Sequence, residues 1–214
     1  SYNQATKQIG GLHINRAWLC YFINLTVSHN IGKSGGAHIF KSRKMIAYKC
    51  RFTENNGRRN GGAVRTDTTQ HVLIIDSRFE QNMAAKGAGV YIETGFYLQV
   101  ITCVFQRNIA KYGAGMNIFD IEFVETYKSN FINNYGKTTG GGLYCLQSII
   151  CKLIMSSFLS NKALNYGAGV YIRQGKTLYV FYCSILSNNA QNRIAGLYSS
   201  GVTFSYLIYS VIGK

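Results

Sequence analysis

Residues 103–116 read CVFQRNIAKYGAGM, and variants of this stretch recur along the chain. An aromatic residue followed three positions later by Asn begins at Phe52, Phe79, Phe105, Phe131 and Phe158. Weaker copies run from Val27 to Asn30 and from Ile185 to Asn188, and an eighth copy begins at Val211. The steps between copies are 25, 27, 26, 26, 27, 27 and 26 residues. Such regularity indicates a repeat protein.

The rest of each repeat keeps the same phase. Two positions before the aromatic residue stand Cys50, Ser77, Cys103, Ser129, Ser156 and Cys183. Seven positions before it stand mostly apolar residues, from Cys20 in the first copy to Phe204 in the last. Two positions after each Asn there is only Gly or Ala, and a glycine-rich segment such as 113–115 follows. Short, alternating runs of Val, Ile, Tyr and Phe predict strands.

One repeat of this kind cannot bury its apolar residues alone, so neighbouring repeats must stack. Stacking predicts a Phe ladder from the five aromatic residues above and an Asn ladder from Asn30, Asn55, Asn82, Asn108, Asn134, Asn161 and Asn188. We expect the Asn side chains to hydrogen-bond between layers and to favour a left-handed turn. The sequence therefore predicts an all-β, right-handed parallel β-helix of about eight coils of 25–27 residues, in one domain over residues 1–214. A leucine-rich repeat also carries Asn after an apolar position, but the glycine-rich, strand-like remainder of each repeat disfavours it.

The motif Cys-x-Phe-x-x-Asn-x-(Ala/Gly) is followed by Gly-Gly-Ala-Val at 61–64 or by Gly-Ala-Gly-Val-Tyr, as at 87–91. This pattern resembles the repeats of the polymorphic outer-membrane proteins and, more broadly, of autotransporter adhesin passengers. The resemblance spans nearly the whole chain. It implies a β-helical rod outside the cell or at its surface, with an adhesin as one expected role.

Acidic residues are scarce. The chain has 23 Lys and Arg against 8 Asp and Glu, a formal charge of +15, and every acid lies between Glu54 and Glu125. Acid-dependent chemistry is therefore confined to the middle of the chain, which counts against most hydrolases. The best cluster is Glu54, Asp76 and Glu80, and glycoside hydrolysis needs two carboxylates at a defined separation. We interpret the three as ion-pair partners of Arg51 and Arg78, and predict no enzymatic activity; a polysaccharide-active enzyme is the least favoured alternative.

Basic residues are concentrated between positions 41 and 65, where Glu54 is the only acid. The candidate strip for an anionic polysaccharide or another cell-surface polymer consists of Lys41, Arg43, Lys44, Arg58, Arg59 and Arg65. The alternative is that these charges keep a strand-rich rod soluble. The aromatic residues belong mostly to core columns, which disfavours dedicated nucleic-acid binding.

The remaining candidates carry less information. Cys145 and Cys151 are close enough in sequence to pair, whereas buried thiols filling small spaces are the alternative. The four His residues do not recur at metal-ligand spacing, so we expect neither a metal nor a cofactor. Asn24 begins the only glycosylation sequon, 24–26. No stretch approaches the roughly 18 unbroken apolar residues of a membrane helix.

The two ends of the chain share one phase of the repeat, with Asn3 at the Asn position, and neither shows a capping helix or polar repeat. An uncapped β-helix offers unpaired backbone groups, and a head-to-tail contact through them builds a filament. We therefore expect a rigid extracellular rod that stacks on copies of itself. The alternative is one stretch of a longer rod whose caps lie elsewhere.

Overall fold

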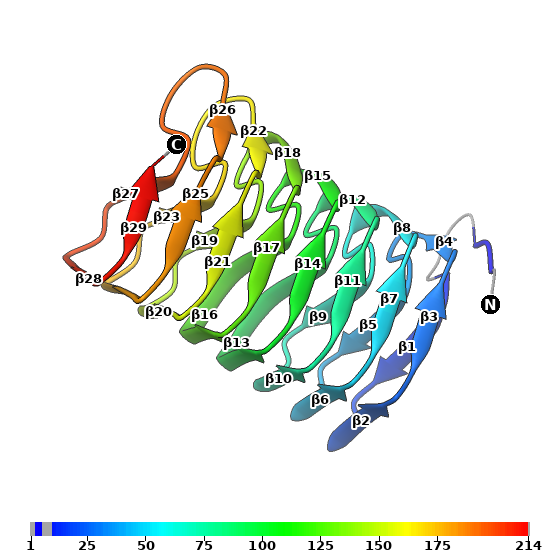
Figure 1. Cartoon of the computed structure of the whole chain (residues 1–214). Coiled ribbons are helices and arrows are strands. Elements are labelled where there is room, and N and C mark those ends of the chain that lie inside the picture. The colour runs from blue at the N-terminus through cyan, green and yellow to red at the C-terminus, as the bar shows by residue number, and fades with distance from the viewer. Residues whose placement is uncertain (1–2, 6–9, 214) are drawn as a thin grey trace.

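The computed structural model describes residues 3–5 and 10–213, and these form a right-handed parallel β-helix without helices (Figure 1). Every strand pairs in parallel with the equivalent strand of the next coil, so three sheets run the length of the rod. This confirms the predicted fold class, and the absence of a helix from the described coils excludes a leucine-rich repeat. None of the described residues belongs to a helix long and apolar enough to cross a membrane.

Sheet 1 has 14 strands and two arms. Its first arm contains β1 (Leu12–Asn15), β5 (Ala37–Phe40), β9 (Val64–Asp67), β19 (Leu143–Leu146), β23 (Val170–Arg173) and β27 (Leu197–Ser200). Its second arm contains β2 (Leu19–Ile23), β6 (Lys44–Tyr48), β10 (His71–Ile75), β20 (Ile150–Ile154), β24 (Thr177–Phe181) and β28 (Phe204–Ile208). The long strands β13 (Val90–Ile101) and β16 (Met116–Tyr127) pair with both arms.

Sheets 2 and 3 complete each coil. Sheet 2 contains β3 (Thr26–Ser28), β7 (Arg51–Thr53), β11 (Arg78–Glu80), β14 (Val104–Gln106), β17 (Asn130–Ile132), β21 (Ser157–Leu159), β25 (Ser184–Leu186) and β29 (Val211–Gly213). Sheet 3 contains β4 (Ile31–Gly32), β8 (Asn56–Asn60), β12 (Met83–Lys86), β15 (Ile109–Tyr112), β18 (Tyr135–Thr139), β22 (Lys162–Ala163) and β26 (Asn189–Ala190). The stack makes about seven turns from β3 to β29.

The predicted register is confirmed for the first seven copies and wrong by one residue in the eighth. Ile212, not Val211, lies opposite Ile185 in sheet 2. In the second arm Ser205, not Phe204, lies opposite Leu178. Apolar residues at both 211 and 212 leave the phase ambiguous in the sequence. The Ser210 hydroxyl decides it, because it accepts a hydrogen bond from the backbone N–H of Cys183 at 3.1 Å.

The Phe ladder forms as predicted. Successive rings of Phe52, Phe79, Phe105, Phe131 and Phe158 stack within 7° of parallel, with centroids 4.6–5.2 Å apart. All five side chains are fully buried. The glycine-rich segment lies against them: a Cβ on Gly115 would stand 2.4 Å from the Gly142 carbonyl oxygen and 2.9 Å from Phe131 Cδ1. Glycine is needed there because two backbones and a ring meet.

The Asn ladder is also confirmed. The Nδ2 group of Asn108 donates to Oδ1 of Asn134 at 3.0 Å and to the Phe79 carbonyl oxygen at 2.8 Å. Its own Oδ1 accepts from the backbone N–H and from Nδ2 of Asn82. The same side-chain bond joins every pair of neighbours from Asn30 to Asn188 and extends to Asn3. Each buried amide is thus satisfied by the coils on both sides.

The expectation that Asn takes the left-handed turn is wrong. The residue just before each ladder Asn does so instead: His29, Glu54, Gln81, Arg107, Asn133, Ser160 and Ser187 have φ between 53° and 58°. The ladder Asn must direct its amide inward to reach the next coil, so the bend is made one position earlier, at the exposed corner. A second row of left-handed residues, from Asn24 to Tyr209, turns the chain from sheet 1 into sheet 2.

Candidate functional site

The predicted basic strip does not form one surface. Lys41 lies in the bend after β5, and Arg43 and Lys44 lie where the second arm of sheet 1 begins. Arg58 and Arg59 lie in β8 of sheet 3, on another side of the rod. The physical reason is that one coil takes 25–27 residues, so a segment as long as 41–65 travels round the whole rod.

Arg65 is not available to a ligand in the way predicted. Its Nη2 atom lies 2.7 Å from Oδ2 of Asp67, and Nε2 of His38 lies 2.8 Å from the same oxygen. Burial raises the pKa of Asp67, but the hydrogen bonds from His38 and Arg65 outweigh it and hold the pKa below its usual value. Arg43 packs over the ring of Trp18 at 4.0 Å. Both side chains are therefore held in contacts of their own.

The three carboxylates singled out in the sequence do not converge. Oε2 of Glu80 lies 2.9 Å from Arg51 Nη2, and its Oε1 lies 3.6 Å from Arg78 Nη1, as we interpreted them. Glu54 instead faces His29 at 3.0 Å, and Asp76 accepts a hydrogen bond from Thr102. Asp76 and Glu54 lie in the bends at opposite ends of the sheet 2 strands.

The cysteines are all buried and free, Cys145 and Cys151 included. The residues two positions before each Phe-ladder position form a column of Cys and Ser, and its thiols do more than fill space. Cys103 Sγ donates to the carbonyl oxygens of Ile101 and Ile74, at 3.2 and 3.5 Å. Ser129 makes the equivalent bonds one coil later. Burial raises the pKa of Cys103 to about 12, so this thiol stays protonated. Among residues 3–5 and 10–213, no three His, Cys, Asp or Glu side chains are grouped to hold a metal.

Asn24 is exposed in the bend between β2 and β3, with φ of 50°. Thr26 of the sequon is also exposed. The acceptor is thus accessible from solvent, and its glycosylation remains a prediction.

Sheet 3 carries a basic surface that the sequence analysis missed. Outward and inward residues alternate where its strands are regular, as in β18, where Tyr135 and Lys137 are exposed around the buried Gly136. We define the basic face as these outward rows together with the exposed bend residue before each ladder Asn. Its exposed cations include Lys33, Arg58, Arg59, Arg107, Lys111, Lys137 and Lys162, with Lys86 at its edge.

Acids are nearly absent from the basic face. Within the described residues its only carboxylate is Glu54, which faces His29, whereas the other seven acids lie on sheets 1 and 2 and their bends. Counting charges by position in the repeat, rather than by windows of consecutive residues, would have revealed this face. Only Arg58 and Arg59 of the predicted strip belong to it.

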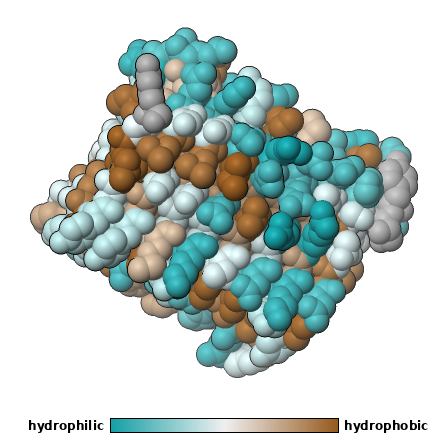
Figure 2. Space-filling view, in the orientation of Figure 1, coloured by the Kyte–Doolittle hydropathy of each residue, from teal (hydrophilic) through white to brown (hydrophobic). Residues whose placement is uncertain are grey.

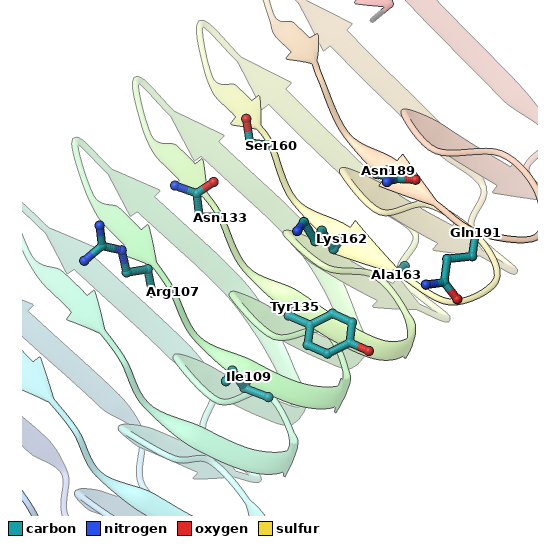
Figure 3. Close-up of a pocket in the computed structure, with 9 residues that line it drawn as sticks. All are labelled: Arg107, Ile109, Asn133, Tyr135, Ser160, Lys162, Ala163, Asn189 and Gln191. Carbon is teal, nitrogen blue, oxygen red and sulfur yellow. The ribbon is translucent and has the colours of Figure 1, made fainter.

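A groove of about 630 Å³ crosses the C-terminal half of the basic face (Figure 3). Two rows of side chains follow the rod axis: the bend residues Arg107, Asn133 and Ser160, and the strand residues Ile109, Tyr135, Lys162 and Asn189. Ala163 and Gln191 complete the lining. The lining contains two cations and no carboxylate.

A second groove, of about 500 Å³, lies over the first arm of sheet 1 and is lined by tyrosines. The rings of Tyr144 and Tyr171 stack 4.8 Å apart at 2°, and Tyr198 continues the stack. Because these rings stack on one another, their faces are not accessible to a ligand, which could contact mainly the ring edges and the hydroxyl groups. Tyr91 is buried and donates to Glu93 at 3.0 Å, and both effects raise the pKa of its hydroxyl. This groove thus contains a carboxylate.

The comparisons with known proteins identify the architecture. A family profile described as a right handed beta helix region matches residues 2–131, more than half of the chain. Searches of curated proteins and of solved structures returned no match. The matched residues contain four of the five ladder phenylalanines and the matching part of the Asn ladder. The sequence match and the parallel three-sheet coil agree, and the chain belongs to the right-handed β-helix family.

Proposed function

We propose that this protein is an extracellular structural β-solenoid, a rigid rod that stacks end to end on copies of itself into a surface filament. The observation that carries the proposal is that the inward columns of the last described coil are apolar and exposed. Leu207 and Ile212 are 50% and 42% exposed, although Val180 and Ile185, one coil earlier in the same columns, are fully buried. In the first described coil Leu12 is 40% exposed, whereas Phe22 and Val27 are 6% and 5% exposed, so a second copy would add to their existing contacts.

A second copy is the natural occupant because its end coil offers the same columns. Stacking β27 to β29 of one copy on β1 to β3 of the next would place Leu197 against Leu12, Leu207 against Phe22 and Ile212 against Val27. These contacts repeat the interior pattern of every other coil. Such a head-to-tail contact does not close on itself and so forms a filament.

Electron microscopy together with sedimentation velocity over a range of concentrations tests the stacking. We expect unbranched fibres with a repeat of about 4.8 Å along the axis. Leu207→Lys should abolish them, whereas Ser157→Lys, which adds the same charge on the outward side of β21, should not. Monomers at every concentration would overturn the proposal.

The second candidate function is that of an adhesin-like rod that binds an anionic polysaccharide along its side. The basic face favours it, since its exposed cations greatly outnumber its one described carboxylate, Glu54. Salt-sensitive retention on a sulfated-polysaccharide column tests it, measured at concentrations below filament formation. We expect the Arg58→Ser/Arg59→Ser variant to elute at lower salt than the parent. Elution of the parent in low salt would overturn this function.

We further propose that the protein has no catalytic activity, because Glu54, Asp76 and Glu80 engage separate partners on separate bends and strands. Incubation with acidic polysaccharides should release no reducing ends. Release by the parent protein, lost in Asp76→Asn, would assign it an enzymatic function.

A further inference from the structure

We propose that the groove over β15, β18, β22 and β26 binds an extended acidic polysaccharide, carboxylated or sulfated, lying along the rod axis. The inference rests on the second candidate function and not on filament formation. Its core is one juxtaposition: Arg107 in the bend row, and the exposed Tyr135 and Lys162 in the strand row, line one groove whose described residues include no carboxylate (Figure 3).

The spacing of the cations suits an extended chain. Arg107 and Lys162 belong to coils two apart, which separates them by about 10 Å along the axis at about 4.8 Å per coil. Neither takes part in an ion pair with any described acid. No acid follows Glu125 in the chain, and the three acids of the coil that carries Tyr135 lie in β16 of sheet 1 and not on the basic face. A negative ligand therefore meets no repulsive group in this part of the face.

Tyr135 supplies an apolar surface of the kind that packs against a sugar ring. It is 42% exposed, and no described aromatic ring stacks on it, in contrast to Tyr144 and Tyr171. Its neighbours in the strand row are Ile109 and Lys162, whose aliphatic stems leave the ring accessible. The coil that carries this ring lies between the coils of Arg107 and Lys162.

Uncharged polar side chains complete the groove. The side-chain amides of Asn133, Asn189 and Gln191 line it without a hydrogen-bond partner among the described residues. Each amide offers donors and an acceptor, which match sugar hydroxyls. Asn133 is held outward by the bend, with φ of 54°.

The composition of the groove favours a polysaccharide over a single-stranded nucleic acid. Nucleic-acid channels use successive aromatic platforms for consecutive bases, together with a dense basic track. Here there is one open ring, and the coil between the cations contributes amide and hydroxyl groups to the lining. The tyrosine groove on sheet 1 also has two cations, Lys86 and Arg173, but Glu93 lies in it and its rings stack on each other, which makes it a poorer site for a polyanion.

Affinity chromatography and affinity electrophoresis with four polymers test the inference: heparin, polygalacturonate, neutral dextran and oligo(dT). The groove variant is Arg107→Ser/Lys162→Ser. Its matched control is Lys128→Ser/Lys152→Ser, which removes two cations from sheet 1 and its bend and gives the same net charge. Circular dichroism melting confirms that each variant is folded, and Leu207→Lys is included in every protein to keep it monomeric.

We expect the parent to bind heparin or polygalacturonate but not dextran, and the groove variant to lose about tenfold or more in affinity while the control stays within about twofold. Tyr135→Ala should lose several-fold without changing the salt dependence. Ser160→Glu offers an independent test, because Glu54 occupies the equivalent bend position in an earlier coil and shows that the fold accepts it. This variant should also abolish binding.

The outcomes separate the two ideas. If the parent binds no polyanion, the second candidate function fails. If the parent binds but the groove variant matches the control, polymer binding stands and the groove is the wrong site. If oligo(dT) binds more tightly than either polysaccharide and depends on the groove, the ligand class is wrong.

Discussion

Phe105 in the middle of the rod and Ile212 in the last coil occupy the same inward column, yet Phe105 is fully buried and Ile212 is 42% exposed. Both lie in short strands of the same sheet, so the strand itself does not bury them. At Phe105 burial comes from the coil on each side, although Val27, in the same column of the first described coil, is also buried. Stability in this fold therefore resides largely in contacts between neighbouring repeats. A substitution should therefore matter in proportion to the number of coils its side chain contacts.

The largest expected effect is that of Phe105→Ala. The ring stacks on Phe79 at 4.7 Å and on Phe131 at 4.6 Å, so its removal leaves a cavity shared by three coils. We expect a loss of about 3–5 kcal/mol in the free energy of unfolding. Urea denaturation followed by circular dichroism measures it, with Gln106→Ala on the outward side of the same strand as the control. An unfolding midpoint equal to that of the parent would contradict the ladder assignment.

Asn108→Ala should come next. The substitution removes a side-chain donor to the buried Phe79 carbonyl oxygen and the acceptor of the buried Asn82 amide groups, while Asn134 Oδ1 keeps the backbone N–H of residue 108. Since an unsatisfied buried polar group costs about 1–3 kcal/mol, we expect a loss of about 2–4 kcal/mol. Asn130→Ala, on the outward side of β17, is the control and should change stability by less than about 0.5 kcal/mol. Equal effects of the two would show that the ladder bonds add nothing to stability.

A smaller effect is expected outside the core, where Asp67 joins two coils through His38. Because its pKa is lowered in the folded state, ionised Asp67 stabilises the protein above its unfolded pKa of about 3.9, and this contribution is lost as the pH falls through the lower folded value. We expect Asp67→Asn to cost about 1–3 kcal/mol at pH 7. The difference from the parent should shrink below about pH 4. Thermal melts from pH 2 to pH 8 check this, with exposed Asp120→Asn as the control, and a difference independent of pH would contradict it.

The interior of the rod could be predicted from the sequence because each inward position meets its own equivalent in the next coil. Phe52, Phe79 and Phe105 occupy equivalent buried positions in three successive coils, so a period of 25–27 residues is enough to place them. The same reasoning erred by one residue at Ile212, since an apolar residue on either side of the correct phase satisfies the pattern and only the Ser210 hydrogen bond distinguishes them.

The exterior could not be predicted in the same way, because outward positions do not repeat. The outward row of sheet 2 carries Glu80 in an early coil and Ile132 and Leu159 in later ones. Figure 2 shows the result, a band of hydrophobic surface toward the C-terminal coils and hydrophilic side chains toward the N-terminal coils. A search for runs of charge joins residues such as Lys41 and Arg58 that lie on different sides of the rod. The candidate groove was missed because Arg107 and Lys162 are 55 residues apart in sequence.

The smallest expected effect on stability is that of Ile212→Ala in the last described coil. Ile212 contacts a coil on one side only, so Ile212→Ala should lower the stability of the monomer by less than about 1 kcal/mol, well below the cost of Phe105→Ala. In a filament the same side chain would gain a second neighbour and become as buried as Ile185. The variant should therefore raise the concentration needed for assembly while leaving the melt of the dilute monomer nearly unchanged. Measured by sedimentation, an unchanged assembly concentration would show that the inward column of the last coil is not the interface.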